Sequence, residues 1–395
     1  MVQIFENKMM KKAAAAMMCA AVLASSVPLT AWAEEAGTPV PGAQGSSAET
    51  AGSIGESQQS SEGAQAGGPG VVQESEAAPQ ETAVPAAGAE ASGSADENAQ
   101  AAAAAWEAER AGLQLHQSYA GTVKPWLFYK AAYDERQQPF ERGKDLWWYK
   151  KVINEKLYQP LKKAGIKLVL MVVPDKETLY GEDYLPEAMK EALRKPDRID
   201  QFRDYMQKNF PELDIYYPEA DMLAAKANGL PLYYASDSHW NFVGAGVCAE
   251  GLMRHLGAEY ALSEPPEISY RLTGETARGD LQEFEGLDES WNRVEYEAQG
   301  MWTAEKVYSA NDPETGEEIY AQYRAQDERA LPKTLYFCGD SYRWYIQYLL
   351  NGQFRDSYFV QRYQFSAADA IAHGADVFVY ELPERFLPQL GSLIS

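Results

Sequence analysis

Short apolar runs alternate with longer amphipathic segments from residue 145 to the end of the chain. The apolar runs are rich in β-branched and aromatic residues, and KLVLMVV at 167–173 is the clearest of them. Such runs are typical of buried strands. They predict strands at 167–173, 214–217, 334–337, 357–361 and 376–380.

The segments between these runs place apolar residues three and four positions apart, which is the spacing of one helical face. They predict helices at 145–164, 186–194, 198–210, 219–228, 244–256, 344–350 and 366–373. Nearly continuous apolar strands between helices indicate a mainly parallel sheet that helices cover on both faces. The predicted fold class is therefore α/β of the doubly wound type, in which chemistry collects at the carboxyl ends of the strands.

Residues 257–330 break this alternation. They are polar, with scattered aromatic residues and with turn signals such as Asn311-Asp312-Pro313 and Thr315-Gly316. We interpret them as an insertion with some antiparallel strand, placed between two halves of the sheet.

The first 33 residues have the pattern of an export signal. Several lysines precede an apolar run at 13–31, and Ala31-Trp32-Ala33 fits a small-x-small cleavage site. Ser25 and Pro28 interrupt the run, which argues against a permanent membrane span. We predict a cleaved signal peptide over 1–33 and an extracytoplasmic, secreted or cell-envelope protein, with an uncleaved anchor as the alternative.

Residues 34–105 differ completely in composition from the rest of the chain. They contain Ala, Gly, Ser, Glu, Gln and Pro but no aromatic residue, Lys or Arg, so they predict a disordered acidic spacer. Residues 106–395 are rich in aromatic residues, and their length predicts one large globular domain or one domain with an insertion. The formal net charge of -23 argues against nucleic acid as a partner. Outside the signal segment only Cys248 and Cys338 remain, which predicts two buried thiols rather than a disulfide framework.

The stretch TLYFCGDSY at 334–342 runs from an apolar strand into Gly339-Asp340-Ser341 and then into a predicted helix. A serine in such a turn presents its hydroxyl at the carboxyl edge of the sheet. Backbone N–H groups at the helix start lie nearby and can stabilise a developing oxyanion. Ser341 is therefore either a candidate nucleophile or an ordinary helix N-cap.

The stretch DSHWN at 237–241 comes after a short strand-like segment. Residues two apart in an extended segment point to the same side, so Asp237 can reach the ring of His239 and fix its tautomer. The other ring nitrogen is then free to act as a base, as in a hydrolytic triad. The alternative is a structural histidine in a loop. Trp240 either walls the site or anchors the loop.

A metal site is a further interpretation of an Asp-x-His pair. The other histidines, His116, His255 and His373, have no companion ligand at a suitable spacing, and HExxH and clustered Cys/His patterns are absent. We therefore expect no metal and no cofactor. In VVPDKETLY at 172–180, Lys176 is either a ligand for an anionic or polar substrate group or a surface-loop lysine.

The two main motifs complement each other. One offers an exposed serine and the other an Asp-His pair, and both come directly after predicted strands of one sheet. Nucleophilic acyl chemistry needs a hydroxyl, a base and a group that orients the base. Ser341, His239 and Asp237 supply these three types.

The motif order resembles the alginate O-acetyltransferase (DHHW) branch of the SGNH-hydrolase-like proteins, in which Asp-x-His-Trp precedes GDS. Three further stretches fit this resemblance: GTVKPWLFYK at 121–130, VVPDKETLYGEDYLP at 172–186 and VYELPERFL at 379–387. The resemblance covers nearly all of 120–390. It implies a three-layer αβα sandwich in which the acid and the histidine precede the serine, unlike their order in ordinary SGNH hydrolases.

The same resemblance implies an extracytoplasmic serine O-acetyltransferase that acts on hydroxyls of an exported or cell-wall polysaccharide. Ser341 matches the nucleophile, His239 the base and Asp237 the triad acid. A membrane-bound O-acyltransferase is the implied source of the acyl group. A polysaccharide acetyl esterase with the same triad and a non-catalytic glycan-binding or scaffold protein are the alternatives.

The sequence departs from the family pattern in its oxyanion-binding residues, because clear counterparts of the SGNH glycine and asparagine blocks are missing. The resemblance then leaves the role to backbone N–H groups near Ser341, with Tyr342, Arg362 and Tyr363 as further candidates. The preceding spacer suggests a cell envelope unlike that of alginate producers, so the expected polymer is not alginate.

Overall fold

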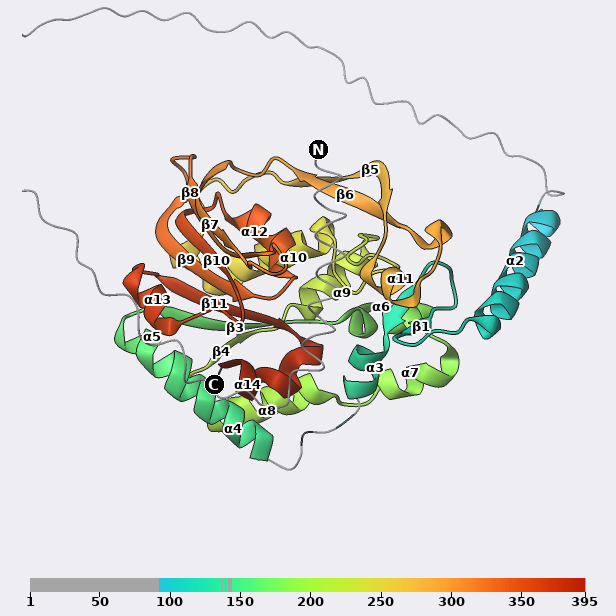
Figure 1. Cartoon of the computed structure of the whole chain (residues 1–395), viewed down its shortest axis with the longest axis horizontal. Helices are drawn as coiled ribbons and strands as arrows, with labels where there is room; N and C mark the ends of the chain where they lie inside the picture. Colours follow the sequence, from blue (N-terminus) through green and yellow to red (C-terminus); the bar gives the residue numbers. More distant parts are fainter. Residues whose placement is uncertain (1–91, 137, 139, 141–143, 395) are drawn as a thin grey trace, which may run out of the picture. The chain divides into compact units, whose positions relative to one another are not determined.

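A sheet of seven strands occupies the centre of the computed structural model, which describes residues 92–136, 138, 140 and 144–394 (Figure 1). Its strands are, in spatial order, β4 (Asp214–Tyr216), β3 (Lys167–Val173), β11 (Val377–Pro383), β9 (Leu331–Gly339), β10 (Phe354–Gln361), β8 (Glu318–Ala325) and β7 (Ala304–Asn311). The strands from β4 to β10 are parallel to their neighbours, and β8 and β7 are antiparallel. The predicted mainly parallel α/β sheet is confirmed.

Strand β3 shows why the sheet is covered on both faces. Alternate side chains of a strand point to opposite faces, and the apolar residues of β3 belong in turn to two separate core clusters. One cluster takes Val169, Met171 and Val173, and the other takes Leu168, Leu170 and Val172. The continuous apolar run that predicted a buried strand therefore serves two cores.

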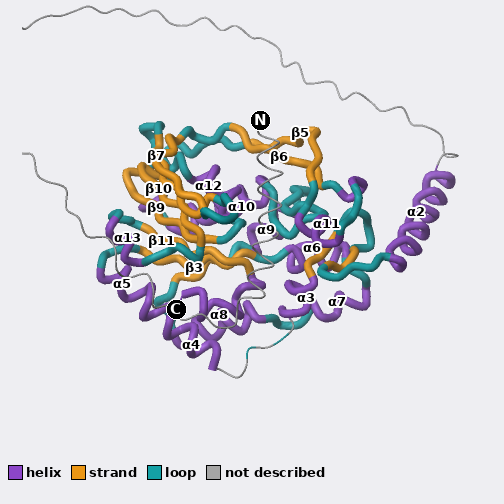
Figure 2. The backbone as a smooth tube through the Cα atoms, viewed as in Figure 1, coloured by secondary structure: helices purple, strands orange, loops and turns teal. Residues whose placement is uncertain are grey.

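Helices form a layer on each face of the sheet (Figures 1 and 2). The first core cluster packs against α6 (Lys176–Tyr184), α9 (Glu219–Ala227), α10 (Phe242–Leu256) and α12 (Arg343–Leu350). The second packs against α4 (Lys144–Val152), the π-helical turn Ile153–Tyr158, α5 (Gln159–Lys163), α8 (Arg198–Asn209), α13 (Ala367–Ala372) and α14 (Leu390–Ile394). The result is the three-layer αβα arrangement.

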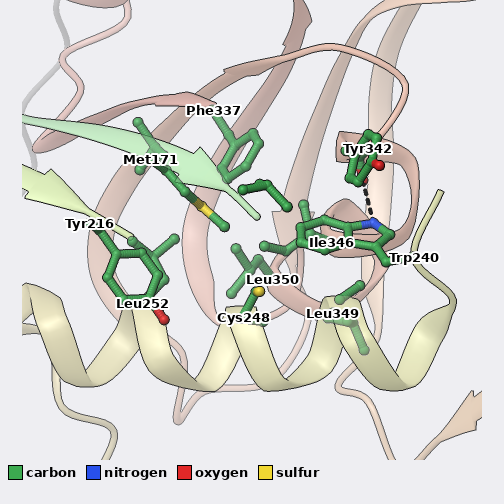
Figure 3. Packing of buried hydrophobic residues seen from close by; sticks show 14 of the residues in the cluster. Met171, Tyr216, Trp240, Cys248, Leu252, Phe337, Tyr342, Ile346, Leu349 and Leu350 are labelled. Atoms are coloured by element: carbon green, nitrogen blue, oxygen red, sulfur yellow. Dashed lines mark hydrogen bonds between the residues drawn. The ribbon is translucent and has the colours of Figure 1, made fainter. Parts of the chain in front are cut away.

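Helices α10 and α12 lie side by side and position the loops that carry the candidate site (Figure 1). Figure 3 shows Cys248 and Leu252 of α10 packed with Ile346, Leu349 and Leu350 of α12. Cys248 lies in the first core cluster and Cys338 in the second, and both are buried free thiols, as predicted.

The insertion 257–330 contains the expected antiparallel strands, but the prediction of its place was wrong. Strands β7 and β8 extend the β10 edge of the sheet, whereas β11 pairs with both β3 and β9 and so joins the two halves directly. Strands β5 (Ser269–Ala277) and β6 (Arg293–Gln299) form a separate antiparallel ribbon, and α11 (Asp280–Glu285) lies between them in the chain. A polar antiparallel hairpin suits a sheet edge, where one side stays exposed.

Four of the remaining elements lie ahead of β3 in the chain, and the other four follow it. They are α2 (Ser92–Gly112), β1 (Ser118–Ala120), β2 (Leu127–Tyr129), α3 (Lys130–Arg136), α7 (Glu187–Leu193) and the 3-10 turns Ala258–Tyr260, Glu289–Trp291 and Glu384–Gln389. Trp106 of α2 packs with Leu127, Leu281 and Trp291 in a third cluster. This cluster fixes α11 against the β1–β2 ribbon.

The composition of 92–105 predicts part of the disordered spacer, but these residues belong to helix α2, so this part of the prediction was wrong. This segment contains an unbroken alanine run, and alanine is the strongest helix former. The predicted signal peptide 1–33 and the spacer up to residue 91 lie outside the described residues. Within the described part, no helix combines the length and the apolar character that a membrane crossing requires.

Candidate active site

Ser341 lies just past the carboxyl end of β9, a central strand of the sheet. Strand β9 ends at Gly339 and α12 begins at Arg343, so Ser341 occupies the turn between them. Its Oγ lies 2.7 Å from Nε2 of His239. The N-cap position of α12 is Tyr342 and no side chain caps the helix there, so the N-cap interpretation of Ser341 is wrong.

The turn around Ser341 is held from below. The Asp340 N–H donates to Oε2 of Glu381 at 3.1 Å, and Oδ1 of Asp340 accepts the Tyr342 N–H at 2.9 Å. A Cβ on Gly339 would lie 2.3 Å from that Glu381 oxygen, so a larger residue there would displace the carboxyl group that holds the turn. Burial raises the pKa of the Glu381 carboxyl well above its usual value, which keeps this group uncharged beneath the turn.

His239 lies between Ser341 and Asp237. Its Nδ1 is 2.8 Å from Oδ1 of Asp237, and its backbone N–H donates to the same oxygen at 2.8 Å. Because the carboxylate accepts at Nδ1, the neutral ring carries its proton there and Nε2 is free to accept from Ser341. Burial alone lowers the pKa of His239, but the hydrogen bond and charge of Asp237 raise it above its usual value.

The second oxygen of Asp237 binds residues of the insertion. Oδ2 accepts from a guanidinium nitrogen of Arg293 and from the backbone N–H of Asp280 at 3.0 Å. Although burial favours the protonated form of Asp237, the charge of Arg293 and the hydrogen bonds from His239 hold its pKa well below the usual range. Asp237 therefore stays ionised.

Asp280 is a second carboxylate beside the histidine, with Oδ2 3.4 Å from Nδ1 of His239. Its oxygens accept from Ser238, at 2.6 Å from the backbone N–H and 2.5 Å from the hydroxyl. Burial, followed by the nearby charge of Asp237, raises the pKa of Asp280. Asp280 and Arg293 were missed from the sequence because both lie far along the chain from Asp237 and no local motif marks them.

A metal ion does not suit this group of ligands. Among the described residues, Asp237, His239 and Asp280 are the one set of carboxylate and histidine atoms close enough to share an ion. Oxygens of both carboxylates already accept hydrogen bonds, and Arg293 places a positive charge against Asp237. The donor set fits a hydrogen-bonded catalytic group.

Tyr342 and Trp240 connect the two loops that carry Ser341 and His239. The Tyr342 hydroxyl donates to the carbonyl of Ser238 at 2.5 Å, and the indole N–H of Trp240 donates to the carbonyl of Tyr342 at 3.1 Å (Figure 3). Both side chains are 0% exposed, so neither contacts a substrate directly. Of the two roles predicted for Trp240, anchoring the loop is the one its contacts match.

Lys176 fits neither of its predicted roles. It is 1% exposed, and its ammonium group donates to the carbonyls of Tyr234, Ala235 and Asp237 at 3.2, 3.0 and 2.6 Å. Burial lowers the pKa of Lys176 to about 8. Because its three donors are used, Lys176 shapes the backbone ahead of His239 and has none left for a substrate.

Arg362 and Tyr363 lie on the other side of the Ser341 turn. Arg362 is 5% exposed and donates to Oδ2 of Asp340 at 3.3 Å and to the Tyr363 hydroxyl at 2.6 Å. The Tyr363 side chain is 59% exposed. Arg362 thus supports Asp340, the residue before Ser341, through its side chain. The Ser341 backbone N–H donates to no acceptor among the described residues.

Comparison with known proteins gives a family match that spans both motifs. The family described as SGNH hydrolase-like domain, acetyltransferase AlgX, matches residues 122–348, more than half of the chain. A curated relative, the probable alginate O-acetylase AlgJ of Pseudomonas putida, is 26% identical over 293 residues, which are 68% of this chain and 70% of the relative.

Two solved structures are similar to the chain at low sequence identity. A DHHW family protein from Eubacterium siraeum is 14% identical with a TM-score of 0.49, covering 63% of this chain and 88% of that structure. The O-acetyltransferase domain of Pseudomonas putida AlgJ is 20% identical with a TM-score of 0.46, covering 70% of this chain and 98% of that domain.

Proposed function

The chain belongs to the family of SGNH hydrolase-like acetyltransferases represented by AlgX, and on this premise we propose that it acetylates hydroxyls of an exported or cell-wall polysaccharide through Ser341. The observation that carries the proposal is the unbroken hydrogen-bonded series from Asp237 through His239 to the Ser341 hydroxyl. The predicted signal peptide supports action outside the cytoplasm. A membrane-bound O-acyltransferase would then supply the acyl group.

The first half-reaction transfers acetyl from a donor ester to the enzyme. His239 Nε2 takes the hydroxyl proton as Ser341 Oγ attacks the acetyl carbonyl carbon, and the bond to the donor oxygen breaks. The proton passes from Nε2 to the departing donor oxygen, which leaves an acetyl-serine. Asp237 remains ionised and stabilises the imidazolium while it exists.

The second half-reaction moves the acetyl group to the glycan. A sugar hydroxyl gives its proton to Nε2 of His239 and attacks the acetyl-serine carbonyl. The ester bond to Ser341 breaks, and the serine oxygen recovers the proton from the imidazolium. In both halves the Ser341 backbone N–H is our proposed oxyanion donor, because it has no acceptor among the residues that the structure describes and belongs to the nucleophile itself.

The test is Ser341→Ala in the purified full chain, assayed with p-nitrophenyl acetate alone and with an added glycan. We expect both acetate release and acetyl transfer to fall by at least about a thousandfold, as when a triad member is removed. Ser309→Ala, the same change at an exposed position on β7, is the matched control and should keep full activity.

Three results would contradict the proposal in different ways. Unchanged turnover of Ser341→Ala would refute the nucleophile. Serine-dependent acetate release without any glycan ester across neutral and charged glycans would indicate an esterase, since water would then be the acceptor. Failure of a sulfonyl fluoride to label Ser341 in the folded chain would favour a non-catalytic glycan-binding protein.

A further inference from the structure

We propose that four aromatic residues beside the triad, Phe242, Trp344, Tyr345 and Tyr348, form a platform that binds an uncharged glycan chain as the acetyl acceptor. This inference rests on the proposed function, because it names the class of acceptor for the same site. The inference follows from where these rings lie, how exposed they are and which charged groups surround them. We call the four residues the aromatic platform.

Three members of the aromatic platform lie on one side of α12, the helix that follows the nucleophile turn. Trp344, Tyr345 and Tyr348 lie within one turn of one another, at spacings of one, three and four positions, and they follow Ser341 by three, four and seven positions. All three are partly or largely exposed, and Tyr348 is 48% exposed. The other face of α12 is buried in the core through Ile346, Leu349 and Leu350.

Phe242 ties the aromatic platform to the histidine loop. It follows His239 by three positions and is the first residue of α10. Its ring centroid lies 5.1 Å from that of Tyr345 and 6.3 Å from that of Tyr348. The aromatic platform therefore begins next to both Ser341 and His239 and continues along α12 away from them.

Contacts also link the platform to the triad acid. The ring of Tyr345 lies 6.1 Å from that of Tyr234. The guanidinium of Arg293 stacks over the Tyr234 ring at 4.2 Å and pairs with Asp237. These contacts fix Tyr345 relative to the triad acid, which places the aromatic platform beside the proposed acetyl-serine.

Flat, partly exposed rings suit a ligand with apolar faces. Binding sites are commonly lined by aromatic side chains, and exposed apolar patches with polar rims mark interaction surfaces. The C–H faces of a pyranose ring provide such an apolar surface while its hydroxyls remain at the edge. A stack against Tyr348 leaves those edge hydroxyls free to react or to bind water.

The charges around the aromatic platform argue against an acidic glycan. Arg293 is neutralised by Asp237 and Glu295, and Lys306 pairs with Glu318. Arg343, the basic residue within α12, is 0% exposed. Arg293 and Arg343 are buried, and Lys306, whose side chain is 41% exposed, is already paired with Glu318, so none of the three offers a uronate carboxylate an unpaired cation. The chain's net charge of -23 also repels polyanions.

The length of the aromatic platform indicates a polymer or oligomer. Tyr348 lies seven positions after Ser341, and most of that separation is helix, so the two lie on the order of 10 Å apart along the chain direction of α12. A single sugar placed for reaction at Ser341 does not reach Tyr348. Acceptors should therefore improve as sugar units are added until the chain covers Tyr348.

The experiment measures acetyl transfer from p-nitrophenyl acetate by the full chain to two panels of tetrasaccharides. One panel holds tetramers of glucose, mannose, galactose and N-acetylglucosamine, and the other holds the tetramers of glucuronic, mannuronic and galacturonic acid. We expect transfer to a neutral tetramer, a lower KM for tetramers than for monomers, and no comparable transfer to uronate tetramers.

Variants at Tyr348 test the aromatic platform itself. Tyr348→Ala should raise the acceptor KM roughly tenfold, the loss of one stacking contact, while the kcat for transfer changes much less. Tyr348→Phe should restore the KM, because the ring rather than the hydroxyl binds. Tyr308→Ala, which removes a similarly exposed tyrosine from β7, is the matched control and should leave the KM unchanged.

The outcomes separate this inference from the function on which it rests. Transfer only to uronates, or an unchanged KM in Tyr348→Ala, would overturn the aromatic platform as a neutral-glycan site while leaving the acetyltransferase function intact. Serine-dependent donor hydrolysis without transfer to any tetramer would refute the proposed transferase function, and the aromatic platform with it. Donor hydrolysis that survives Ser341→Ala would instead refute the proposed nucleophile. A cooperative thermal unfolding transition in each variant would establish that the variant is folded.

Discussion

Replacement of Asp237 by asparagine keeps the size of the side chain and removes its charge. Oδ1 accepts from Nδ1 and the backbone N–H of His239, each at 2.8 Å. Oδ2 accepts from Arg293 and from the Asp280 N–H at 3.0 Å. Every partner is a donor, so the new amide NH2 group faces another donor whichever way it turns.

The size of the effect follows from these contacts. If the amide nitrogen faces His239, it donates to Nδ1, and the ring proton moves to Nε2, which then cannot accept from Ser341. The corresponding change in a serine triad lowers kcat by about 10⁴, or about 5 kcal/mol in the activation barrier. If the nitrogen faces Arg293 instead, the broken buried ion pair lowers the free energy of unfolding by up to about 3–5 kcal/mol, less what Glu295 retains.

The assay is the steady-state kcat for p-nitrophenyl acetate, with thermal unfolding measured in parallel. Asp280→Asn is the matched control, because its carboxylate lies 3.4 Å from the same Nδ1 but accepts hydrogen bonds from Ser238. We expect a far smaller loss of kcat from that variant. A folded Asp237→Asn protein that keeps both a kcat within tenfold of the parent and the parent's stability, or an equal loss of kcat in Asp280→Asn, would refute the assigned geometry.

Three other predictions rest on contacts of the same site. His239 must be neutral to act as the base, and its pKa is raised, so log kcat/KM should fall as the pH is lowered, with a midpoint above the usual histidine pKa of about 6.5. A flat profile from pH 9 to 5 would contradict the assignment of His239 as the base. Arg293→Met should lower the free energy of unfolding by about 3 kcal/mol. Arg293 depresses the pKa of Asp237, so the parent keeps the stability from this ionised carboxylate until the pH falls well below the ordinary carboxyl pKa. Without Arg293 that pKa rises, and the variant should lose this stability at a higher pH than the parent. Urea titrations between pH 3 and 7 measure the difference. In Gly279→Ala the new Cβ would lie 2.1 Å from the Ser236 carbonyl oxygen, so kcat should fall at least about tenfold. Gly274→Ala in the β5 ribbon is the control, because its added Cβ meets open space and should mainly affect stability. Equal kcat values for the two variants would count against the role of this close approach.

Much of the fold was predictable because burial leaves a local pattern. Strand β3 has the predicted bounds, since both of its faces need apolar residues. Helix α6 was missed because Pro174 and Asp175 look like the start of a loop, although a residue in Asp175's extended conformation can begin a helix. The insertion was placed wrongly because sequence periodicity identifies a strand but does not identify the edge to which it adds.

The candidate site was predictable only in part, for a similar reason. The Asp-x-His and Gly-Asp-Ser stretches each carry a local signal, and the structure brings Ser341, His239 and Asp237 together. The partners of the acid do not carry one, because Arg293 and Asp280 meet Asp237 only after the insertion folds back. Lys176 was assigned to substrate or surface because buried lysines are rare, and nothing in the sequence shows that three carbonyls receive it.

Hydrogen exchange at the Trp240 indole N–H, which donates to the Tyr342 carbonyl, can report how often the site opens. The indole proton is buried, so deuterium from solvent replaces it only when the histidine loop and the serine loop move apart. Its exchange rate therefore reports the free energy of that opening, and a single indole resonance can follow it. A catalyst that holds its groups in place before the donor arrives should show slow exchange at this proton, and an acetyl-serine should leave it slow.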